Sequence, residues 1–384
     1  MARRGANEGT ISLRKDGRWQ ARLHLGYEAG RRRRKSFYGH TRREVQEQLT
    51  RALRDQQQGI PVATDERQTV EQYLRRWLTD AVRPSVRAST YAAYEMHLRL
   101  YLIPELGRIP LARLTPQHVQ ALINAKLRSG LAPRSVLHMR AVLRRALNQA
   151  LRWGLVPRNV ATLVDPPRVP RYEVQAITPQ QARAFLDAVR GDRLEGLYTV
   201  ALAVGLRQGE VLGLRWEDLD LEGGFLTVRH ALQRVGGRLQ LVEPKTRLSC
   251  RTIAMPPLVV GALREHRKRQ LQERLWAGSR WHEGGYVFAT TIGTPLDGTN
   301  VTHHLQALLL GADLPRQRFH DLRHACASLL LAQGVHPRVV MEMLGHSQIG
   351  LTMNTYSHVI PALKREAADQ MEAILEPAQE LDAR

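Results

Sequence analysis

Cysteine and lysine are both scarce in this chain of 384 residues. Its two cysteines, Cys250 and Cys326, are far apart in the sequence, and neither belongs to a CxxC motif. A disulfide framework and a zinc knuckle are therefore not indicated, and a reducing compartment is expected. Only six of the 57 basic residues are lysines, so arginine supplies almost all of the positive charge.

Long apolar runs and nucleotide-binding loops are also missing. The first residues, MARRGANEGT, contain no apolar core of a signal peptide, and no uninterrupted apolar stretch approaches the ~20 residues of a membrane span. We therefore expect a cytoplasmic bacterial protein, associated with the nucleoid and without a membrane partner. A GxxxxGK[ST] loop is absent, so ATP-driven chemistry is not supported.

Positive charge is abundant. Lys and Arg outnumber Asp and Glu by 57 to 36, which gives a formal net charge of +21. Such an excess indicates a polyanionic partner, and nucleic acid is the soluble polyanion that fits best. The hydrophobic content of 43% is enough to fill the cores of two or three domains.

Residues 1–60 are expected to form a small DNA-binding domain with a three-stranded sheet and one helix. Residues 18–25 alternate between polar and apolar side chains, which is typical of a strand with one buried face. The basic run RRRRKSFY predicts another strand, and Thr41 with Glu44 predicts a capping box at the start of a helix. On the sheet face opposite that helix, the expected DNA contacts are Arg18, Arg22, Arg32 and Arg34.

Residues 66–160 are expected to form a compact basic bundle of four helices. Its longest helix, from Ser135 to Trp153, carries the expected DNA contacts Arg140 and Arg144. Four prolines between positions 157 and 172 then mark a domain boundary. The third region, 172–384, begins with a helix at Thr178 and continues with short β-like runs at FLTVRH, RLQLVEPKT and RTIAMP. The predicted fold class is mainly α with small β-sheets.

Several residues of the third region suit the binding of a phosphate. The motif GLRQGE places Arg207 three residues before Glu210, which can hold the guanidinium in one orientation. The motif FHDLRH places His320 and Arg323 on one face of a helix. Taken singly, each residue has a plainer interpretation, such as a surface ion pair or a core histidine.

Three further residues complete the set. Lys245 lies in EPKTRLSCR, at an expected hairpin between two β-like runs, and His346 follows a Leu-Gly pair. Tyr356 lies ten residues further on, among small polar neighbours. An isolated lysine in a turn or a helix tyrosine with a bonded hydroxyl would again be the plainer interpretation.

Together these residues match one reaction. A tyrosine hydroxyl can attack a DNA phosphodiester and conserve the bond as a phosphotyrosine. Arginines and histidines stabilise the extra negative charge of the transition state without a metal ion. The leaving 5′ oxygen needs a proton, which arginine cannot supply because its pKa exceeds ~12, whereas the pKa of a lysine can be lowered by nearby arginines.

The order of these motifs resembles the tyrosine recombinase family, also called the phage integrases. The resemblance covers nearly the whole chain: PELGRIPLARLTPQHVQALI resembles the family's core-binding domain, and the N-terminal sheet and helix resemble an arm-binding domain. The resemblance implies Arg207 and Arg323 as phosphate clamps, Lys245 as general acid, His320 as an aid to proton transfer from the tyrosine, His346 as a ligand of the scissile phosphate, and Tyr356 as the nucleophile.

The resemblance also implies the partners. They are double-stranded DNA attachment sites, further copies of the chain in a homotetramer on DNA, a host DNA-bending protein and an excisionase. Strands would be exchanged in two steps through a Holliday junction, integrating and excising a phage or mobile element. No cofactor and no metal ion are expected. The apolar positions of the tail after Val359 predict a helix that packs on a neighbouring protomer or on its own domain.

Three other functions remain open at this point. A type IB topoisomerase uses similar residues, although an added N-terminal sheet has little use in it. A recombinase that resolves chromosome dimers would resemble residues 66–375 without the first domain. A DNA-binding regulator without catalysis would explain the charge, but it would leave Lys245 and Tyr356 unexplained.

Overall fold

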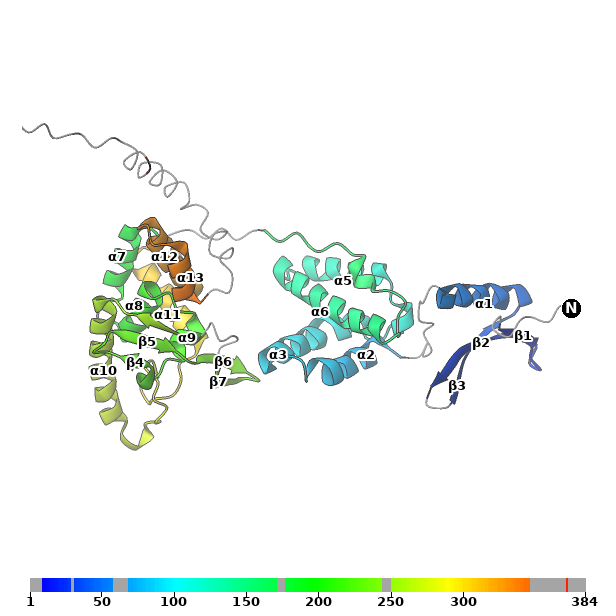
Figure 1. The fold of residues 1–384 in the computed structure, drawn as a ribbon, viewed down its shortest axis with the longest axis horizontal. Coiled ribbons are helices and arrows are strands. Elements are labelled where there is room, and N and C mark those ends of the chain that lie inside the picture. Colours follow the sequence, from blue (N-terminus) through cyan, green and yellow to red (C-terminus); the bar gives the residue numbers. More distant parts are fainter. Residues whose placement is uncertain are drawn as a thin grey trace, which may run out of the picture. The chain divides into compact units, whose positions relative to one another are not determined.

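Helices dominate the structure, and the strands form small antiparallel sheets, as the sequence predicts. The computed structural model describes residues 9–28, 31–57, 68–170, 177–243 and 250–345, together with Met371. The chain divides into two units, Met1–Arg171 and Tyr172–Arg384. Each is described by itself (Figure 1).

The first unit begins with the expected sheet and helix. Its elements are β1 (Thr10–Leu13), β2 (Trp19–Glu28), β3 (Arg31–Gly39) and α1 (Arg42–Gln57). The strand order is β1-β2-β3, and Arg22 pairs with Ser36 between β2 and β3. The alternation along β2 has the predicted effect, because Ala21 and Leu23 are buried against Val45 and Leu49 of α1. One face of the sheet is therefore covered by α1, and the other carries the polar side chains.

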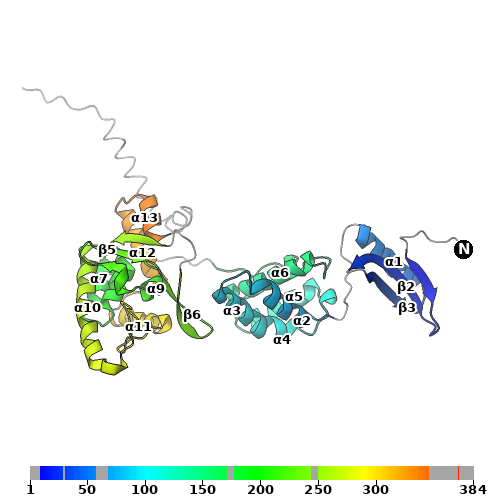
Figure 2. The ribbon, with the colours of Figure 1, turned by 60° about the horizontal axis from the view of Figure 1, so that its bottom comes forward.

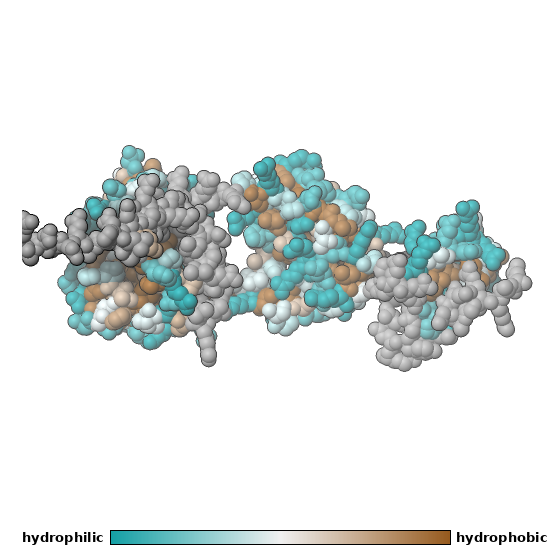
Figure 3. All heavy atoms as spheres, turned by 45° about the horizontal axis from the view of Figure 1, so that its top comes forward, coloured by the Kyte–Doolittle hydropathy of each residue, from teal (hydrophilic) through white to brown (hydrophobic). Residues whose placement is uncertain are grey.

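The rest of the first unit is a bundle of helices with its own hydrophobic core. The helices are α2 (Val70–Trp77), α3 (Ala88–His97), α4 (Ile103–Leu106), α5 (Pro116–Arg128) and α6 (Pro133–Arg152). Thr69 and Thr115 cap α2 and α5 with their hydroxyl groups. Hydrophilic side chains cover much of the face of this bundle seen in Figure 3, with smaller apolar patches between them.

The second unit contains most of the remaining helices and two small sheets. Its helices are α7 (Pro179–Ala188), α8 (Glu195–Ala203), α9 (Gln208–Leu212), α10 (Pro257–Ala277), α11 (Gly298–Gly311), α12 (Phe319–Ala332) and α13 (Pro337–Leu344). Its strands are β4 (Leu219–Asp220), β5 (Phe225–Val228), β6 (Ala231–Val235), β7 (Arg238–Val242) and β8 (Arg251–Ala254). The apolar helix α8 packs against both α10 and α12 in the centre of the core (Figure 1).

The strands of the second unit correct one expectation. The sequence suggests a hairpin near Lys245, between the runs RLQLVEPKT and RTIAMP. In the structure β7 pairs with β6, whereas β8 pairs with β5, so the two runs belong to different sheets. The turn at Gly236 and Gly237 joins β6 to β7, and this hairpin extends from the body of its unit (Figure 2). Local alternation predicts each strand but does not choose its partner.

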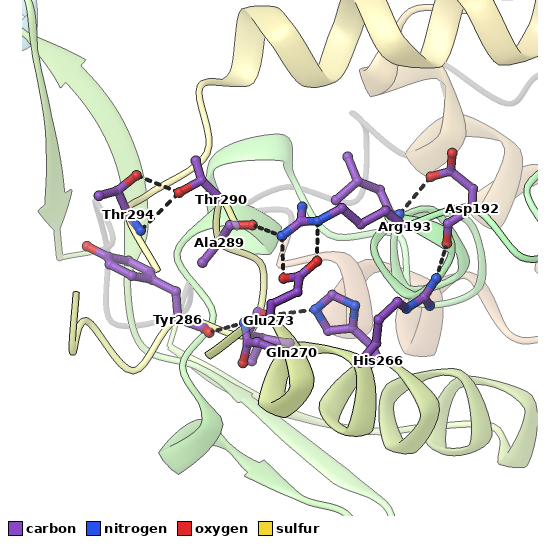
Figure 4. Close-up of polar contacts among 12 residues, drawn as sticks. Asp192, Arg193, His266, Gln270, Glu273, Tyr286, Ala289, Thr290 and Thr294 are labelled. Atoms are coloured by element: carbon purple, nitrogen blue, oxygen red, sulfur yellow. Dashed lines mark hydrogen bonds and ion pairs between the residues drawn. The ribbon is translucent and has the colours of Figure 1, made fainter. Parts of the chain in front are cut away.

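A polar network fixes α10 to the chain around residues 286–294. Arg193 donates to both carboxylate oxygens of Glu273, at 2.6 and 2.7 Å, and to the carbonyl oxygen of Ala289 at 2.9 Å. The ring of His266 and the amide of Gln270 both reach the carbonyl oxygen of Val287. Figure 4 shows how these side chains converge from α10 and the loop before α8. We regard this network as a rigid support for the unit's core.

Candidate active site

Arg207 stands at the sharp turn between α8 and α9. Helix α8 ends at Ala203, and Gly205 then adopts a φ of 69°, in the left-handed region that glycine tolerates best. The chain turns there and presents Arg207 as the residue before α9. Its neighbour Leu206 is buried in the core, which fixes the backbone from which Arg207 projects.

The predicted pairing of Arg207 with Glu210 is confirmed. The Arg207 Nη1 group donates to Glu210 Oε1 at 2.6 Å, and the backbone N–H of Arg207 donates to Glu210 Oε2 at 3.1 Å. Burial alone would raise the pKa of Glu210, but the Arg251 and Arg207 guanidinium groups outweigh it and hold that pKa below its ordinary value. The carboxylate therefore stays ionised and fixes the Arg207 side chain.

His320 and Arg323 lie in the first turns of α12, as their motif predicts. Arg323 is only 1% exposed, and its guanidinium donates to the carbonyl oxygens of Gly205 at 2.8 Å and Leu344 at 2.6 Å. His320 is more exposed, and its ring contacts His324 edge to face. Desolvation, together with the positive charge of Arg323, lowers the pKa of His320 and favours its neutral form.

A third arginine, which the sequence does not single out, completes this cluster. Arg251 begins β8, and its Nη2 group donates to Glu210 Oε2 at 2.9 Å. Its Nε group donates to the carbonyl oxygen of Met343 at 2.7 Å. Glu210 therefore lies between two guanidinium groups, one from α9's start and one from β8. Nothing in RTIAMP separates this arginine from the many others in the chain.

The three arginines meet at the C-terminal end of α13. Arg251, Arg323 and Arg207 donate to the carbonyl oxygens of residues 343, 344 and 345, respectively. These carbonyls carry the negative end of the helix dipole, which attracts cations. Gly345 closes the helix with a φ of 67°. Three guanidinium groups thus meet at one helix end, and Glu210 pairs with two of them, so the cluster suits an anion.

Lys245, His346 and Tyr356 lie outside the described residues. The sequence fixes one relation, which is that His346 directly follows Gly345. The described strand β7 ends at Val242, shortly before Lys245. The roles expected for these three residues therefore remain predictions.

The expected DNA contacts of the N-terminal sheet are placed in part. Arg22 and Arg34 are exposed, and the register of β2 and β3 puts them on the face opposite α1. Arg18 is exposed and forms an ion pair with Asp16 at 3.0 Å. Arg32 belongs to β3, but its side chain lies outside the described residues.

The two arginines expected on the surface of α6 differ in burial. Arg144 is exposed. Arg140 is 9% exposed and its guanidinium donates to the carbonyl oxygen of Val164. It lies four residues after Val136 and three before Leu143, on the apolar stripe of the helix. Its position therefore gives it a structural contact inside the bundle instead of the surface placement that we expected.

Among the residues that the structure describes, no group of three or more His, Cys, Asp or Glu side chains could hold a metal ion. None of the helices in the same ranges combines the length and the apolar character of a bilayer span.

Comparison with known proteins identifies the family of the chain. Residues 175–362 match the model of the phage integrase family, and residues 69–127 match the N-terminal SAM-like domain of phage integrases. A tyrosine recombinase XerC-like protein of Caldanaerobacter subterraneus is 32% identical over 363 residues, which cover 90% of this chain and 93% of the relative. An integrase of Streptomyces ambofaciens is 30% identical over 371 residues, with 93% of each chain covered.

Solved structures show the same fold. The Tn1549 transposon integrase in complex with transposon right end DNA has a TM-score of 0.67 and 23% identity, and covers 78% of this chain and 99% of that one. The lambda integrase tetramer bound to a Holliday junction has a TM-score of 0.56 and 18% identity, covering 90% and 96%. The chain therefore belongs to the phage integrase family of tyrosine recombinases, which are site-specific DNA recombinases.

Proposed function

We propose that this recombinase integrates and excises a phage or mobile element by cleaving double-stranded DNA through a 3′-phosphotyrosine at Tyr356. One observation carries the proposal: the Arg207 and Arg323 guanidinium groups converge on the carbonyls of Leu344 and Gly345. The segment that contains His346 and Tyr356 follows at once in the sequence. A phosphate held by this pair would lie beside the start of that segment.

The arginine pair would act on the non-bridging oxygens of the scissile phosphate. A guanidinium has five N–H donors, and the described residues accept two of those of Arg207. Glu210 fixes the orientation of the group, so little reorganisation is needed when a phosphate arrives. Arg323 is positioned by the carbonyls of Gly205 and Leu344 and adds a second positive charge.

Proton transfer would complete the reaction. His320 has a lowered pKa, so its neutral ring can accept the proton of the Tyr356 hydroxyl as the oxygen attacks phosphorus. The P–O5′ bond breaks, and Lys245 would give a proton to the leaving 5′ oxygen. His346 would donate to the same phosphate. Attack of a free 5′ hydroxyl on the phosphotyrosine then reverses these steps and rejoins a strand.

The assembly proposed is a homotetramer on two attachment sites, with a host DNA-bending protein and an excisionase as further partners. Residues 1–60 would form the arm-binding domain, residues 66–160 the core-binding domain and residues 172–384 the catalytic domain. Arg18, Arg22, Arg32, Arg34 and Arg144 are the proposed contacts to DNA phosphates. The tetramer bound to a Holliday junction is a property of the lambda integrase, and it supports the proposal by family likeness alone.

The decisive experiment replaces the proposed nucleophile. Tyr356→Phe removes one oxygen atom and little volume, so binding to the core site, mapped by footprinting the DNA beside the gene, should persist. The covalent adduct on a nicked suicide duplex should disappear, because no other residue supplies the attacking hydroxyl. An adduct formed by Tyr356→Phe would contradict the assignment. A wild-type protein that binds the site and forms no adduct would instead favour a DNA-binding regulator.

A further inference from the structure

Arg251 is the one member of the arginine cluster to which the proposed reaction gives no task. Its side chain is only 8% exposed, so it is less accessible than Arg207, whose side chain is 39% exposed. It lies on β8, in a different element from Arg207 and Arg323. A buried guanidinium loses much of its hydration, and the structure compensates for this with specific partners.

Those partners connect two parts of the site. On one side, Arg251 Nη2 donates to Glu210 Oε2 at 2.9 Å, and the other oxygen of that carboxylate accepts from Arg207 Nη1 at 2.6 Å. On the other side, Arg251 Nε donates to the carbonyl oxygen of Met343 at 2.7 Å. One planar group thus joins the carboxylate that orients Arg207 to the last turn of α13.

The last turn of α13 is also held by the two clamp residues. The carbonyl oxygen of Leu344 accepts from Arg323, and that of Gly345 accepts from Arg207. Gly345 also lies close to the Arg251 side chain, since a Cβ atom added to Gly345 would lie 3.0 Å from Arg251 Nη1. The chain therefore enters the segment with His346 and Tyr356 from an anchored position.

We propose that Arg251 is a positioning residue for strand cleavage, which sets the orientation of Arg207 by two routes. One route is Glu210, and the other is Met343 at the end of α13, where the carbonyl oxygen of Gly345 accepts from Arg207. The inference rests on the proposed function, because it requires Arg207 to bind the scissile phosphate. Lysine cannot replace Arg251. Its single ammonium group cannot donate to a carboxylate from its tip and to a carbonyl from its stem at the same time.

The test compares Arg251→Lys with a matched control in the full-length protein. The control is Arg264→Lys, because Arg264 also joins a carboxylate, Glu222 at 2.9 Å, to a carbonyl oxygen, Leu221 at 3.1 Å, but on the exposed surface. Two quantities are measured on the nicked core-site duplex: the dissociation constant and the cleavage rate at saturating protein. We expect Arg251→Lys to lower the cleavage rate by ~10²-fold, the scale of a small misplacement of a reacting group, with little change in affinity. Arg264→Lys should change both by less than about fivefold.

A double-mutant cycle separates positioning from general loss of structure. If Arg251 acts through Arg207, then Arg251→Lys should cost little further rate in an Arg207→Ala background. A substrate with a methyl group in place of one non-bridging oxygen has no charge for Arg207 to neutralise, so it should also shrink the defect of Arg251→Lys. A purely structural role predicts the same defect on both substrates.

The outcomes distinguish this inference from the proposed function. A wild-type protein that forms no adduct contradicts the proposed function. If the wild-type protein cleaves, two results overturn the inference alone. One is that Arg251→Lys cleaves within about fivefold of wild type. The other is that the rate loss of Arg251→Lys adds fully to that of Arg207→Ala. If Arg251→Lys does not fold, Glu210→Gln breaks the same connection while keeping both guanidinium groups. It should then show the same fall in rate with unchanged affinity, and a normal rate would overturn the inference.

Discussion

At the scale of single residues, the surroundings of each ionisable group in the site determine whether that group is charged. Glu210 stays ionised because two guanidinium groups outweigh its burial. His324 shows the opposite case: burial, and next the adjacent His320, lower its pKa to about 4. Both imidazoles in the first turns of α12 are therefore neutral near pH 7.

The lowered pKa of His324 predicts a loss of stability in mild acid. The unfolded chain binds a proton to this ring near the ordinary value of 6.5, whereas the folded chain resists it until about pH 4. The contribution is therefore complete above about pH 6.5 and is lost as the pH falls towards 4, by at most ~3 kcal/mol. His320 shifts in the same direction.

The measurement is urea unfolding of the full-length protein between pH 7 and pH 4.5. His324→Gln should flatten the pH dependence, because glutamine does not titrate. His282→Gln, at an exposed position of the same unit, is the control and should leave the slope unchanged. An equal slope in wild type and His324→Gln would show that this ring does not govern the acid response.

Sequence reasoning recovers the residues whose partners are close along the chain. Arg207 and Glu210 are three positions apart, so GLRQGE suffices to predict their contact. Arg251 meets Met343 across 92 positions, and only the tertiary fold brings them together. Arg140 could have been identified as buried, because the helical period of α6 places it among apolar residues. The local motifs point to chemistry, and the distant contacts that orient it need the fold.

At the scale of elements, the turn after α8 and the end of α13 depend on each other. Gly205 has a left-handed backbone, and an added Cβ would lie 2.6 Å from Leu344 Cδ2 and 3.1 Å from the Cβ atom of Cys326. The carbonyl oxygens of Gly205 and Leu344 both accept from Arg323. A substitution at Gly205 would therefore disturb both of these carbonyl groups and, through them, the position of Arg323.

Gly205→Ala should consequently destabilise the second unit by about 2–4 kcal/mol, the sum of left-handed strain and overpacking. Gly191→Ala is the matched control, because Gly191 has a φ of 77° and no atom within 4 Å of an added Cβ. It should cost only about 1 kcal/mol. Amide hydrogen exchange, followed in α12 and α13, measures both effects. Equal protection in the two variants would mean that the contact with Leu344 is unimportant.

The elements themselves were predicted unevenly. The starts of α1 and α7 were predicted well, at Thr41 and Thr178, because the cap residues and their bonds are local. The pairing of β7 and β8 was wrong, since both strands satisfy the same alternation whichever neighbour they choose. The choice is made by the turn at Gly236 and Gly237, where both residues have positive φ and close β7 onto β6.

At the scale of the whole molecule, the N-terminal sheet offers a second surface for DNA. Its polar face is built from strands rather than loops: Gln20 donates to Ser36 Oγ and Tyr38 Oη at 3.1 Å, and Arg22 donates to Gln20 Oε1 at 3.1 Å. These bonds hold the side chains of β2 and β3 in fixed positions. A rigid polar face with exposed arginines can read DNA with little loss of side-chain entropy.

We predict that this sheet binds arm-type sites, distinct from the site of cleavage. A fragment that starts near Asp65 should bind and cleave the core site, and it should lose the footprint over flanking repeats. In the full-length protein, Arg22→Ala and Arg34→Ala should each reduce the salt dependence of arm-site binding by about one unit of slope, as expected for one lost phosphate contact. Arg43→Ala is the control, because Arg43 is an exposed arginine on α1, the helix that covers the opposite face. It should leave the slope unchanged. Identical footprints for the fragment and the full-length protein would show that residues 1–60 are not an arm-binding domain, and a core-only recombinase would then be the better description.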